Sequence, residues 1–215
     1  TTMIAFLDAA ILPSSAAMID IEWSFTIPNG TSIRMGAKDA TTFMVAYWYP
    51  QIAVYDDISG WDELHYNGTT EFYNDFNNYE VEIRLPYDYN VWATGVLQNP
   101  SEVLSASVLN KFNEAKTSEN IIHLIDSNTL KEKKHFNKQS GFNTWKYKAE
   151  NVSDFVFGTS NNALWDATST EVEPGRRVFI SAVYNKVSKD FYEVNKISQD
   201  AVKFFSTEFP AVPFP

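Results

Sequence analysis

Residues 79–85 read YEVEIRL, and this stretch decides the fold class that the sequence predicts. Apolar and charged side chains alternate along it without exception until Pro86. A period of two places one set of side chains on each face, as in a half-buried strand. Residues 90–97 read as another strand after a short turn, so the two stretches are predicted to pair as a hairpin.

Further strand candidates lie on both sides of this stretch. Residues 19–27 read IDIEWSFTI and alternate in the same way. Residues 43–49 are continuously apolar or aromatic, which predicts a strand buried on both faces. Two more candidates lie within 144–157 and one over 177–184. Many short strands separated by turn residues favour a mostly β fold, an antiparallel sandwich.

Two short helices are expected among the strands. The first begins at Ser101, a suitable N-cap, and carries an apolar stripe of Leu104, Val108, Phe112 and Ala115. The second runs from Ser188 to about Ser206, at the carboxyl end. Its apolar residues fall on one face and are Phe191, Val194, Ile197, Ala201, Val202 and Phe205. Residues 209–215 are too rich in proline to continue it and are predicted to form an extended linker.

Composition excludes several classes of protein. The chain has 215 residues, enough for one large domain or one domain with an appendage, and 44% of them are hydrophobic. Lys and Arg total 17 against 27 Asp and Glu, a net charge of −10, so neither nucleic acid nor an anionic membrane surface is an expected partner. No cysteine is present, which excludes thiol nucleophiles, disulfides and zinc fingers. No apolar run approaches the roughly 20 residues of a membrane span.

The histidines do not predict a metal site in this chain. The HExxH zinc motif is absent, as are the phosphate-binding glycine loops and the GxSxG nucleophile motif. His65, His123 and His135 lie in different predicted elements, and none has a second histidine one helical turn away. His123 is predicted to point off the face that its neighbours in 121–125 bury, while His65 and His135 are placed in polar loops.

Other polar clusters have simple structural interpretations. Acidic residues gather within 56–63, where they suit either a calcium loop, an acid/base pair or a solvated turn. The spacing does not match an EF-hand and no cleft is indicated, so a turn is the favoured interpretation. The basic run 131–134 is predicted to be an exposed hairpin turn. Glycosylation-type sequons begin at Asn29, Asn67 and Asn151 and mark exposed loops.

Aromatic residues are dense in the first half of the chain. A platform for stacking sugars and ordinary core packing both explain them, and core packing is favoured because large aromatics dominate cores. They are Tyr47, Trp48, Tyr49, Trp61, Phe72, Tyr73, Tyr87 and Tyr89. The platform supports one alternative function, a free-standing extracellular β-sandwich module that binds carbohydrate or protein. A third hypothesis is an acidic domain whose exposed aromatics dock a protein partner.

Segments in the middle of the chain resemble one family. Residues 48–57, WYPQIAVYDD, resemble the end of a central strand in the amino-terminal domain of aminopeptidase N-like zinc metallopeptidases, the gluzincins. The strand–Pro–turn–strand of that family is similar to 79–86 followed by WATG at 92–95. Residues 145–157, WKYKAENVSDFVF, resemble its most recognisable non-catalytic strand. Gly60–Trp61 and 71–73 are similar to pieces of the family's members in Bacteroidetes.

The resemblance implies a saddle-shaped β domain over residues 1–187 and, over 188–215, a helix and linker that lead to a catalytic domain absent from this chain. The start at Thr1 is expected to fall inside the β domain. Zinc and the catalytic glutamate are expected beyond Pro215, so this chain alone is expected to be neither an enzyme nor a zinc binder. The intact protein is expected to be an exported, periplasmic or cell-envelope aminopeptidase that acts on peptides.

Two substrate-binding positions follow from the resemblance alone. The family's β domain lends the active site a loop whose Gln or Glu holds the free amine of the peptide. The corresponding positions, counted back from Pro50, are Asp39 and Thr41. Both depart from the family's residue types, Asp39 by its shorter side chain and Thr41 by its lack of a carboxyl or amide group.

Overall fold

The computed structural model describes residues 2–31, 34–64, 69, 71, 73–137 and 140–214. It is mostly β, with 35% strand against 18% helix, and its strands pair as antiparallel sheets, as the sequence predicted. Four α-helices lie within these ranges, of which two have seven residues or more. The last lies near the carboxyl end as expected, but it begins at Val194 and not at Ser188, because a separate 3-10 turn, Lys189–Phe191, precedes it.

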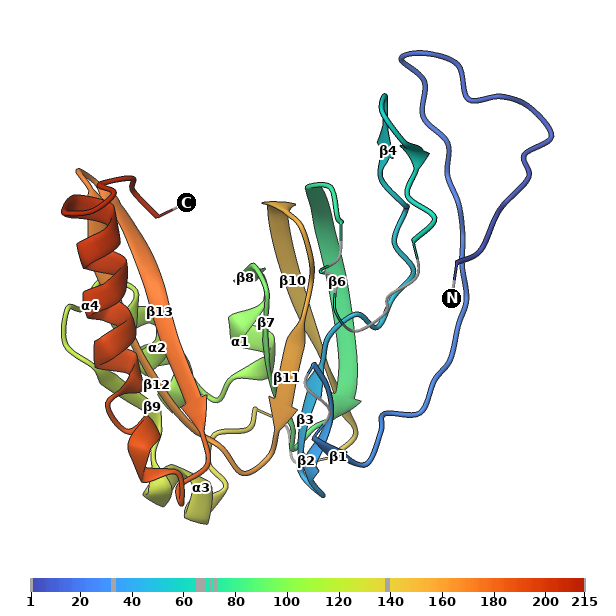
Figure 1. Cartoon of the computed structure of the whole chain (residues 1–215). Helices are drawn as coiled ribbons and strands as arrows, with labels where there is room; N and C mark the ends of the chain where they lie inside the picture. Colours follow the sequence, from blue (N-terminus) through green and yellow to red (C-terminus); the bar gives the residue numbers. More distant parts are fainter. Residues whose placement is uncertain are drawn as a thin grey trace.

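The largest sheet has five strands, with the order β1–β2–β3–β11–β7 (Figure 1). These are β1 (Gly30–Thr31), β2 (Met35–Asp39), β3 (Thr42–Val45), β11 (Phe157–Ser160) and β7 (Asn90–Ala93). The pairing register sets Thr42, Ser160 and Asn90 side by side at one end of the sheet. The loops that meet at this end belong to three distant parts of the sequence.

A second sheet contains the stretch that decided the fold class. Its order is β6 (Asn77–Pro86), β10 (Phe142–Val152) and β8 (Val96–Leu97). The burial of β6 alternates as predicted, with Ile83 buried and Glu82 and Arg84 exposed. The predicted hairpin is wrong, because β6 pairs along its length with β10 while β7 joins the five-stranded sheet. Sequence distance favoured the neighbour in the chain, but the long complementary strand β10 supplies more backbone hydrogen bonds.

The third sheet lies between two helices. Its strands are β13 (Arg176–Tyr184), β12 (Leu164–Glu173) and β9 (Ile122–Ile125). Phe112 of α2 (Ala106–Ala115) packs against Trp165 on one face of this sheet, with ring centroids 5.9 Å apart. Gln199 of α4 (Val194–Thr207) hydrogen-bonds Thr168 on the other face. Figure 1 shows this layering, with α4 outermost at one end of the molecule.

The helix predicted from Ser101 is interrupted. One turn, α1 (Pro100–Val103), ends at Leu104, whose backbone is extended, and α2 then starts afresh. The N-cap of α2 is Ser105, whose hydroxyl accepts from the backbone N–H of Val108, so the predicted cap was wrong. The apolar stripe is confirmed, because Leu104, Val108, Phe112 and Ala115 are all buried.

The basic run 131–134 does not form a hairpin turn. Lys131 lies in the last turn of α3 (Ser127–Glu132), which ends where Lys133 adopts a left-handed conformation with φ 52°. Asp126 caps the other end of α3 by accepting from the N–H of Thr129. The exposure of the lysines was predicted correctly, but the run closes a helix.

About a third of the aromatic residues contribute to one hydrophobic core. Trp145 and Phe155 are fully buried in it, and Trp165 packs edge-on against Trp92 with ring centroids 5.7 Å apart. Trp48 and Tyr49 pack against the same core, which supports the favoured core interpretation for them. Trp61 is exposed in the small hairpin of β4 (Tyr55–Asp56) and β5 (Gly60–Trp61). Tyr47 and Tyr73 are exposed as well, so core packing does not account for these three residues. Phe72 lies outside the described residues.

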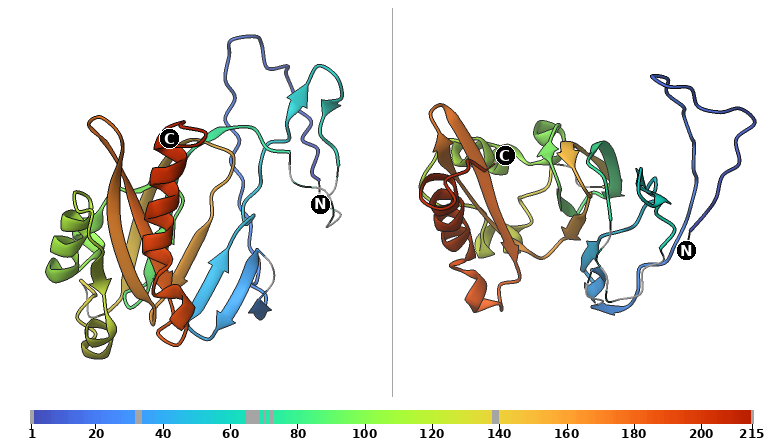
Figure 2. Two further views of the ribbon diagram at one scale, coloured as in Figure 1. Left: turned by 60° about the vertical axis from the view of Figure 1, so that its left-hand side comes forward. Right: turned by 45° about the horizontal axis from the view of Figure 1, so that its top comes forward.

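Two strand predictions differ from the structure. Residues 19–27 form no strand; they are extended, and their apolar side chains are mostly exposed. Figure 2 shows this amino-terminal segment passing beside the body of the molecule. The run 43–49 is buried on one face only: Val45 is buried, Met44 is exposed and the strand ends before Tyr47, which has φ 53°. Periodicity predicts which residues can form a strand, but pairing needs a partner edge.

The helix α4 packs with its polar side inward. Asn195 and Gln199 are buried, and the side-chain amide of Asn195 donates to the carbonyl oxygens of Asp166 and Ile180. Part of the apolar stripe predicted for this helix is exposed, with Ile197 at 59% and Phe205 at 54% of their full accessible areas, while Val194, Ala201 and Val202 are half-buried. The exposed part of the stripe therefore remains available to cover another surface. None of the helices in the described ranges has both the length and the apolar character needed to cross a membrane.

Candidate functional site

Loop residues with acidic side chains converge at one end of the five-stranded sheet. Asp39 and Thr41 form the turn that leads into β3, and Asp88 lies in the turn that leads into β7. Asn161 follows β11 directly, and its side-chain amide donates to Asp88 Oδ2 at 3.3 Å. The register of β3, β11 and β7 brings these turns together. We call Asp39, Asp88, Tyr89 and Asn161 the acidic strand-end cluster.

The turn between β2 and β3 fixes the Asp39 carboxylate. Its Oδ1 atom accepts from the backbone N–H of Thr41 at 2.7 Å and from the Thr41 hydroxyl at 2.8 Å. Slight burial raises the pKa of Asp39, but hydrogen bonds from Thr41 and Thr42 outweigh it and hold the pKa below its usual range. Asp39 is therefore an exposed, fixed anion, and the role of Thr41 is to orient it.

The Tyr89 hydroxyl lies in the negative electrostatic field of this cluster. The pKa of its phenol is raised by burial and by the nearby carboxylates of Asp88 and Asp39. An amine placed among these groups would meet two negative charges and a hydroxyl. Sequence reasoning placed Asp39 here through the family resemblance but missed Asp88. The only signal for Asp88 was its position before a predicted strand, and strand order is needed to bring it to Asp39.

The stretches that carry the resemblance meet at the Tyr49 hydroxyl. This oxygen lies 2.9 Å from the Tyr79 hydroxyl and 3.1 Å from Asp154 Oδ1. It also accepts from the backbone N–H of Phe155 at 3.2 Å and from Gln51 Nε2 at 2.9 Å. Burial, the bond to Tyr79 and the Asp154 charge raise the pKa of Tyr49, so it stays protonated. The network ties three distant segments together and serves the fold.

One histidine is held by a buried carboxylate. His123 Nδ1 lies 2.6 Å from Asp166 Oδ1, and the Tyr184 hydroxyl donates to the other oxygen of Asp166. The Asp166 side chain is buried while the His123 ring is mostly exposed, as predicted from its neighbours. No hydroxyl or thiol nucleophile of the described residues is hydrogen-bonded to this ring. The arrangement joins β9, β12 and β13.

His135 lies in a turn after α3, as predicted, but it is buried and its surroundings are not polar. It is 1% exposed, and its ring lies 3.7 Å, centroid to centroid, from that of Phe136. Burial lowers its pKa, although Nδ1 lies 3.3 Å from the Thr129 carbonyl oxygen, which acts the other way. His65 lies outside the described residues.

The residues that the structure describes do not fit a zinc site. They contain no group of three or more His, Asp or Glu side chains that could hold a metal ion, and the chain has no cysteine. His123 and His135 bind different partners in different elements. No step that needs a metal can therefore be assigned to these side chains.

The acidic stretch 56–63 forms a hydrogen-bonded turn between β4 and β5. Asp56 Oδ1 accepts from the backbone N–H groups of Ser59 and Ile58 at 2.6 and 3.0 Å, and these bonds lower the pKa of Asp56. Asp62 accepts in the same way from the N–H of Leu64. The carboxylates stabilise the backbone of the turn, which supports the favoured interpretation of this stretch.

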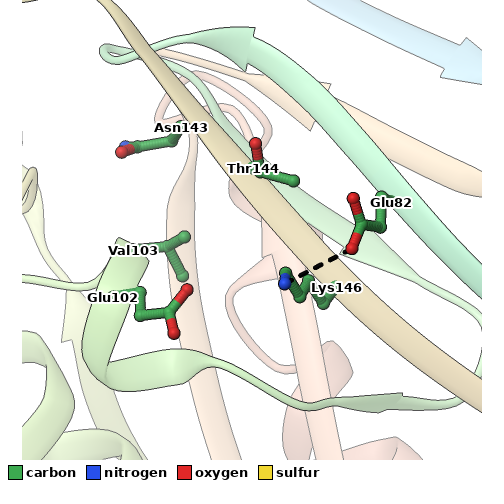
Figure 3. Close-up of a pocket in the computed structure, with 6 residues that line it drawn as sticks. All are labelled: Glu82, Glu102, Val103, Asn143, Thr144 and Lys146. Carbon is green, nitrogen blue, oxygen red and sulfur yellow. Dashed lines mark ion pairs between the residues drawn. The ribbon is translucent and has the colours of Figure 1, made fainter.

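A polar recess of about 310 Å³ lies between α1 and the second sheet (Figure 3). Figure 3 shows Glu102 and Lys146 facing this space from opposite sides. Each has a partner already: Lys146 Nζ lies 3.3 Å from Glu82, and Glu102 accepts from Asn99 Nδ2 at 2.8 Å. The recess holds no buried catalytic pair, and the acidic strand-end cluster remains the stronger candidate site.

No known protein family, curated protein or solved structure matches the chain.

Proposed function

We propose that this chain is the non-catalytic amino-terminal β domain of an aminopeptidase N-like zinc metallopeptidase, and that it walls one side of the substrate cleft. The single observation that carries the proposal is the outward apolar stripe of α4. Ile197, Phe204 and Phe205 are each half exposed or more, although the helix is well anchored through its polar side. An exposed stripe of this kind is typical of a surface that another body covers.

The covering body in this proposal is the catalytic domain of the same polypeptide. The apolar exposure continues past α4 into Phe209, Val212 and Phe214. The backbone there is fixed, because the N–H of Phe214 donates to Ser206 and its carbonyl accepts from Arg176. The exposed apolar residues of this segment therefore follow those of α4 directly in the sequence.

The acidic strand-end cluster supplies the part of this domain that would face substrate. A peptide with a free amino terminus carries a positive charge, which the fixed Asp39 anion and Asp88 attract. The cluster would orient that amine, and zinc bound elsewhere in the intact protein would activate water for cleavage of the peptide bond. The proposed location is an exported, periplasmic or cell-envelope compartment of a bacterium.

The test compares this chain with the polypeptide extended beyond Pro215. We expect the chain alone to hydrolyse no aminoacyl p-nitroanilide and to retain no stoichiometric zinc after dialysis, and the extended polypeptide to do both. In the extended polypeptide, Asp39→Asn should raise KM with little change in kcat, since the cluster binds the amine and does no chemistry. Zinc in the isolated chain, or an extended polypeptide without hydrolytic activity, would contradict the proposal.

The docking surface has its own test within α4. Phe204→Ser with Phe205→Ser should lower the unfolding midpoint of the isolated chain less than that of the extended polypeptide, because half of each ring is already exposed in the isolated chain. The same pair should lower the midpoint of the extended polypeptide by several degrees, since it removes a buried contact there. Lys203→Ser, at an exposed polar residue of α4, is the matched control. Equal effects of the two changes in the extended polypeptide would remove the argument for a covering domain.

A second candidate function has one observation in its favour. Tyr55 and Trp61 are exposed and pack edge-on with ring centroids 5.1 Å apart, as a cross-strand pair of the β4–β5 hairpin. Such a pair could stack on a sugar ring in a carbohydrate-binding module. Selective binding on a glycan array that is lost in Trp61→Ala and kept in Phe76→Ala would favour this alternative.

A further inference from the structure

We propose that residues 19–27 form an interface between two copies of this chain, by pairing antiparallel with the same residues of the second copy. The segment is already extended, and Trp23 holds it against the body through a hydrogen bond from its indole N–H to the Trp48 carbonyl oxygen at 2.8 Å. The ring centroids of Trp23 and Trp48 are 6.1 Å apart. The segment is therefore positioned, and yet it belongs to no sheet.

The backbone of this segment has free pairing capacity. Residues 16–27 make no backbone–backbone hydrogen bond with any other residue that the structure describes. Extended backbone with unpaired N–H and C=O groups is a template for strand addition. Side chains on the apolar face remain accessible, with Trp23 at 44% and Phe25 at 46% exposure. Pairing with another strand would satisfy the backbone and cover part of this apolar surface.

The order of side chains makes the segment complementary to itself. With Trp23 opposite its own copy, Glu22 faces Ser24 and Asp20 faces Thr26. On the other face, Ile21 faces Phe25 and Ile19 faces Ile27 of the copy, and the two Trp23 side chains face each other. No like charges oppose each other, and aromatic and β-branched residues pair across the strands, which is the favourable combination. Such a contact is isologous and closes as a two-fold dimer.

The neighbouring registers are less favourable. Sliding the strands by two residues in one direction sets Glu22 against Glu22 of the copy, and like charges directly opposite are destabilising. Sliding in the other direction places Asp20 opposite Pro28, which has no N–H to donate. The net charge of −10 on each copy opposes association, so we expect the dimer to strengthen as added salt screens that repulsion.

A charge series at Ser24 tests the register by sedimentation velocity. Ser24→Lys should tighten the dimer by roughly 2- to 30-fold, because symmetry places each introduced ammonium group opposite Glu22 of the other copy and so creates two cross-strand ion pairs per dimer. Ser24→Glu should weaken it by a similar factor. Asn110→Lys and Asn110→Glu make the same changes in net charge on the exposed side of α2 and are the matched controls. Ser24 is exposed and its side chain has no hydrogen bond to a described residue, so both variants should fold as the parent does.

Single cysteines give an independent test, since the chain has none of its own. Trp23→Cys places the two thiols opposite each other, about 4.5–5.5 Å apart between Cα atoms and within disulfide range. Ile19→Cys places them about 27 Å apart, because eight strand residues at about 3.4 Å each separate them. Mild oxidation should cross-link the first variant and not the second.

Several outcomes would overturn the proposal. They are a chain that stays monomeric at every concentration and salt, equal effects of the Ser24 and Asn110 changes, and equal cross-linking of both cysteine variants. Protection of residues 19–27 from amide hydrogen exchange in a monomer would also overturn it, because the strand would then pair within its own chain, for example with the free edge of β6.

Discussion

Replacing Tyr49 by phenylalanine removes one oxygen atom from the point where distant segments meet. The ring and its packing against Trp48 and Tyr79, at centroid distances of 5.3 and 5.6 Å, stay in place. The change therefore deletes hydrogen bonds without opening a cavity. Asp154 and Gln51 each lose one partner.

The cost follows from what each partner retains. The backbone N–H of Phe155 keeps its bond to Asp154 Oδ1 at 2.7 Å, so it stays paired. The Tyr79 hydroxyl keeps Gln51 Nε2 at 3.3 Å as a neighbour. The main loss is the bond between Tyr49 and the Asp154 carboxylate, and a hydrogen bond to a charged group is worth about 1.5–3 kcal/mol. We expect a loss of about 2 kcal/mol in the free energy of unfolding, which for a chain of this size is about 4–8 °C in Tm.

Urea unfolding followed by tryptophan fluorescence measures this loss. Tyr55→Phe removes the same atom from an exposed ring in the β4–β5 hairpin and should change stability by less than about 0.5 kcal/mol. The reasoning fails if Tyr49→Phe costs no more than Tyr55→Phe, since the network would then contribute nothing to the fold.

Three more predictions concern single side chains. Gly95→Ala should destabilise the chain by more than about 3 kcal/mol in urea unfolding, because Gly95 has φ 84° and an added Cβ would lie 2.3 Å from the carbonyl oxygen of Lys148. Asn195→Ala should cost about 1–3 kcal/mol in the same assay, since it leaves two buried carbonyl oxygens without their donor. Burial lowers the pKa of His135, so the unfolded chain takes up its proton first, and stability falls as the pH drops from about 6.5 towards the lower folded-state pKa. His135→Phe should remove this contribution, so its stability should decline less between pH 7 and pH 5, by at most about 1.4 kcal/mol per pH unit.

Each of these changes has a matched control. Gly175→Ala imposes the same kind of strain, with φ 81°, but no atom lies within 4 Å of the added Cβ, so it should cost clearly less than Gly95→Ala. Lys203→Ala, on the exposed side of α4, should be nearly neutral beside Asn195→Ala. A parallel pH dependence of the parent and His135→Phe would show that this ring is not a buried neutral base.

Strand β6 of the second sheet was readable because burial on one face leaves a period of two, whereas β12, which is buried on both faces, was not predicted. Residues 79–85 alternate in sequence and in burial alike. The same pattern in 19–27 formed no strand, because periodicity says nothing about whether a partner edge lies within reach. The pairing of β6 with β10 depends on contacts between positions far apart in the sequence, which no local pattern encodes.

The candidate site was less predictable than the fold. Asp39 came from a family resemblance, and its fixed carboxylate follows from a local turn that Thr41 completes. Asp88 joins it only through strand order, which the sequence did not reveal. The apolar stripe of α4 was predicted, but its outward direction was not, because a helix is expected to bury its apolar side. Because polar groups of β12 face α4, the helix buries its polar residues Asn195 and Gln199 against them instead.

The polar contact between α4 and β12 has a consequence for geometry. Apolar side chains can slide past one another at small cost, whereas the amide of Asn195 must meet the carbonyl oxygens of Asp166 and Ile180, and Gln199 must reach Thr168. These hydrogen bonds fix the position of α4 on the sheet, because rotation of the helix or a shift by one turn would break all of them at once. The orientation of α4, and with it the direction in which the chain leaves the helix at Thr207, is therefore fixed relative to the third sheet.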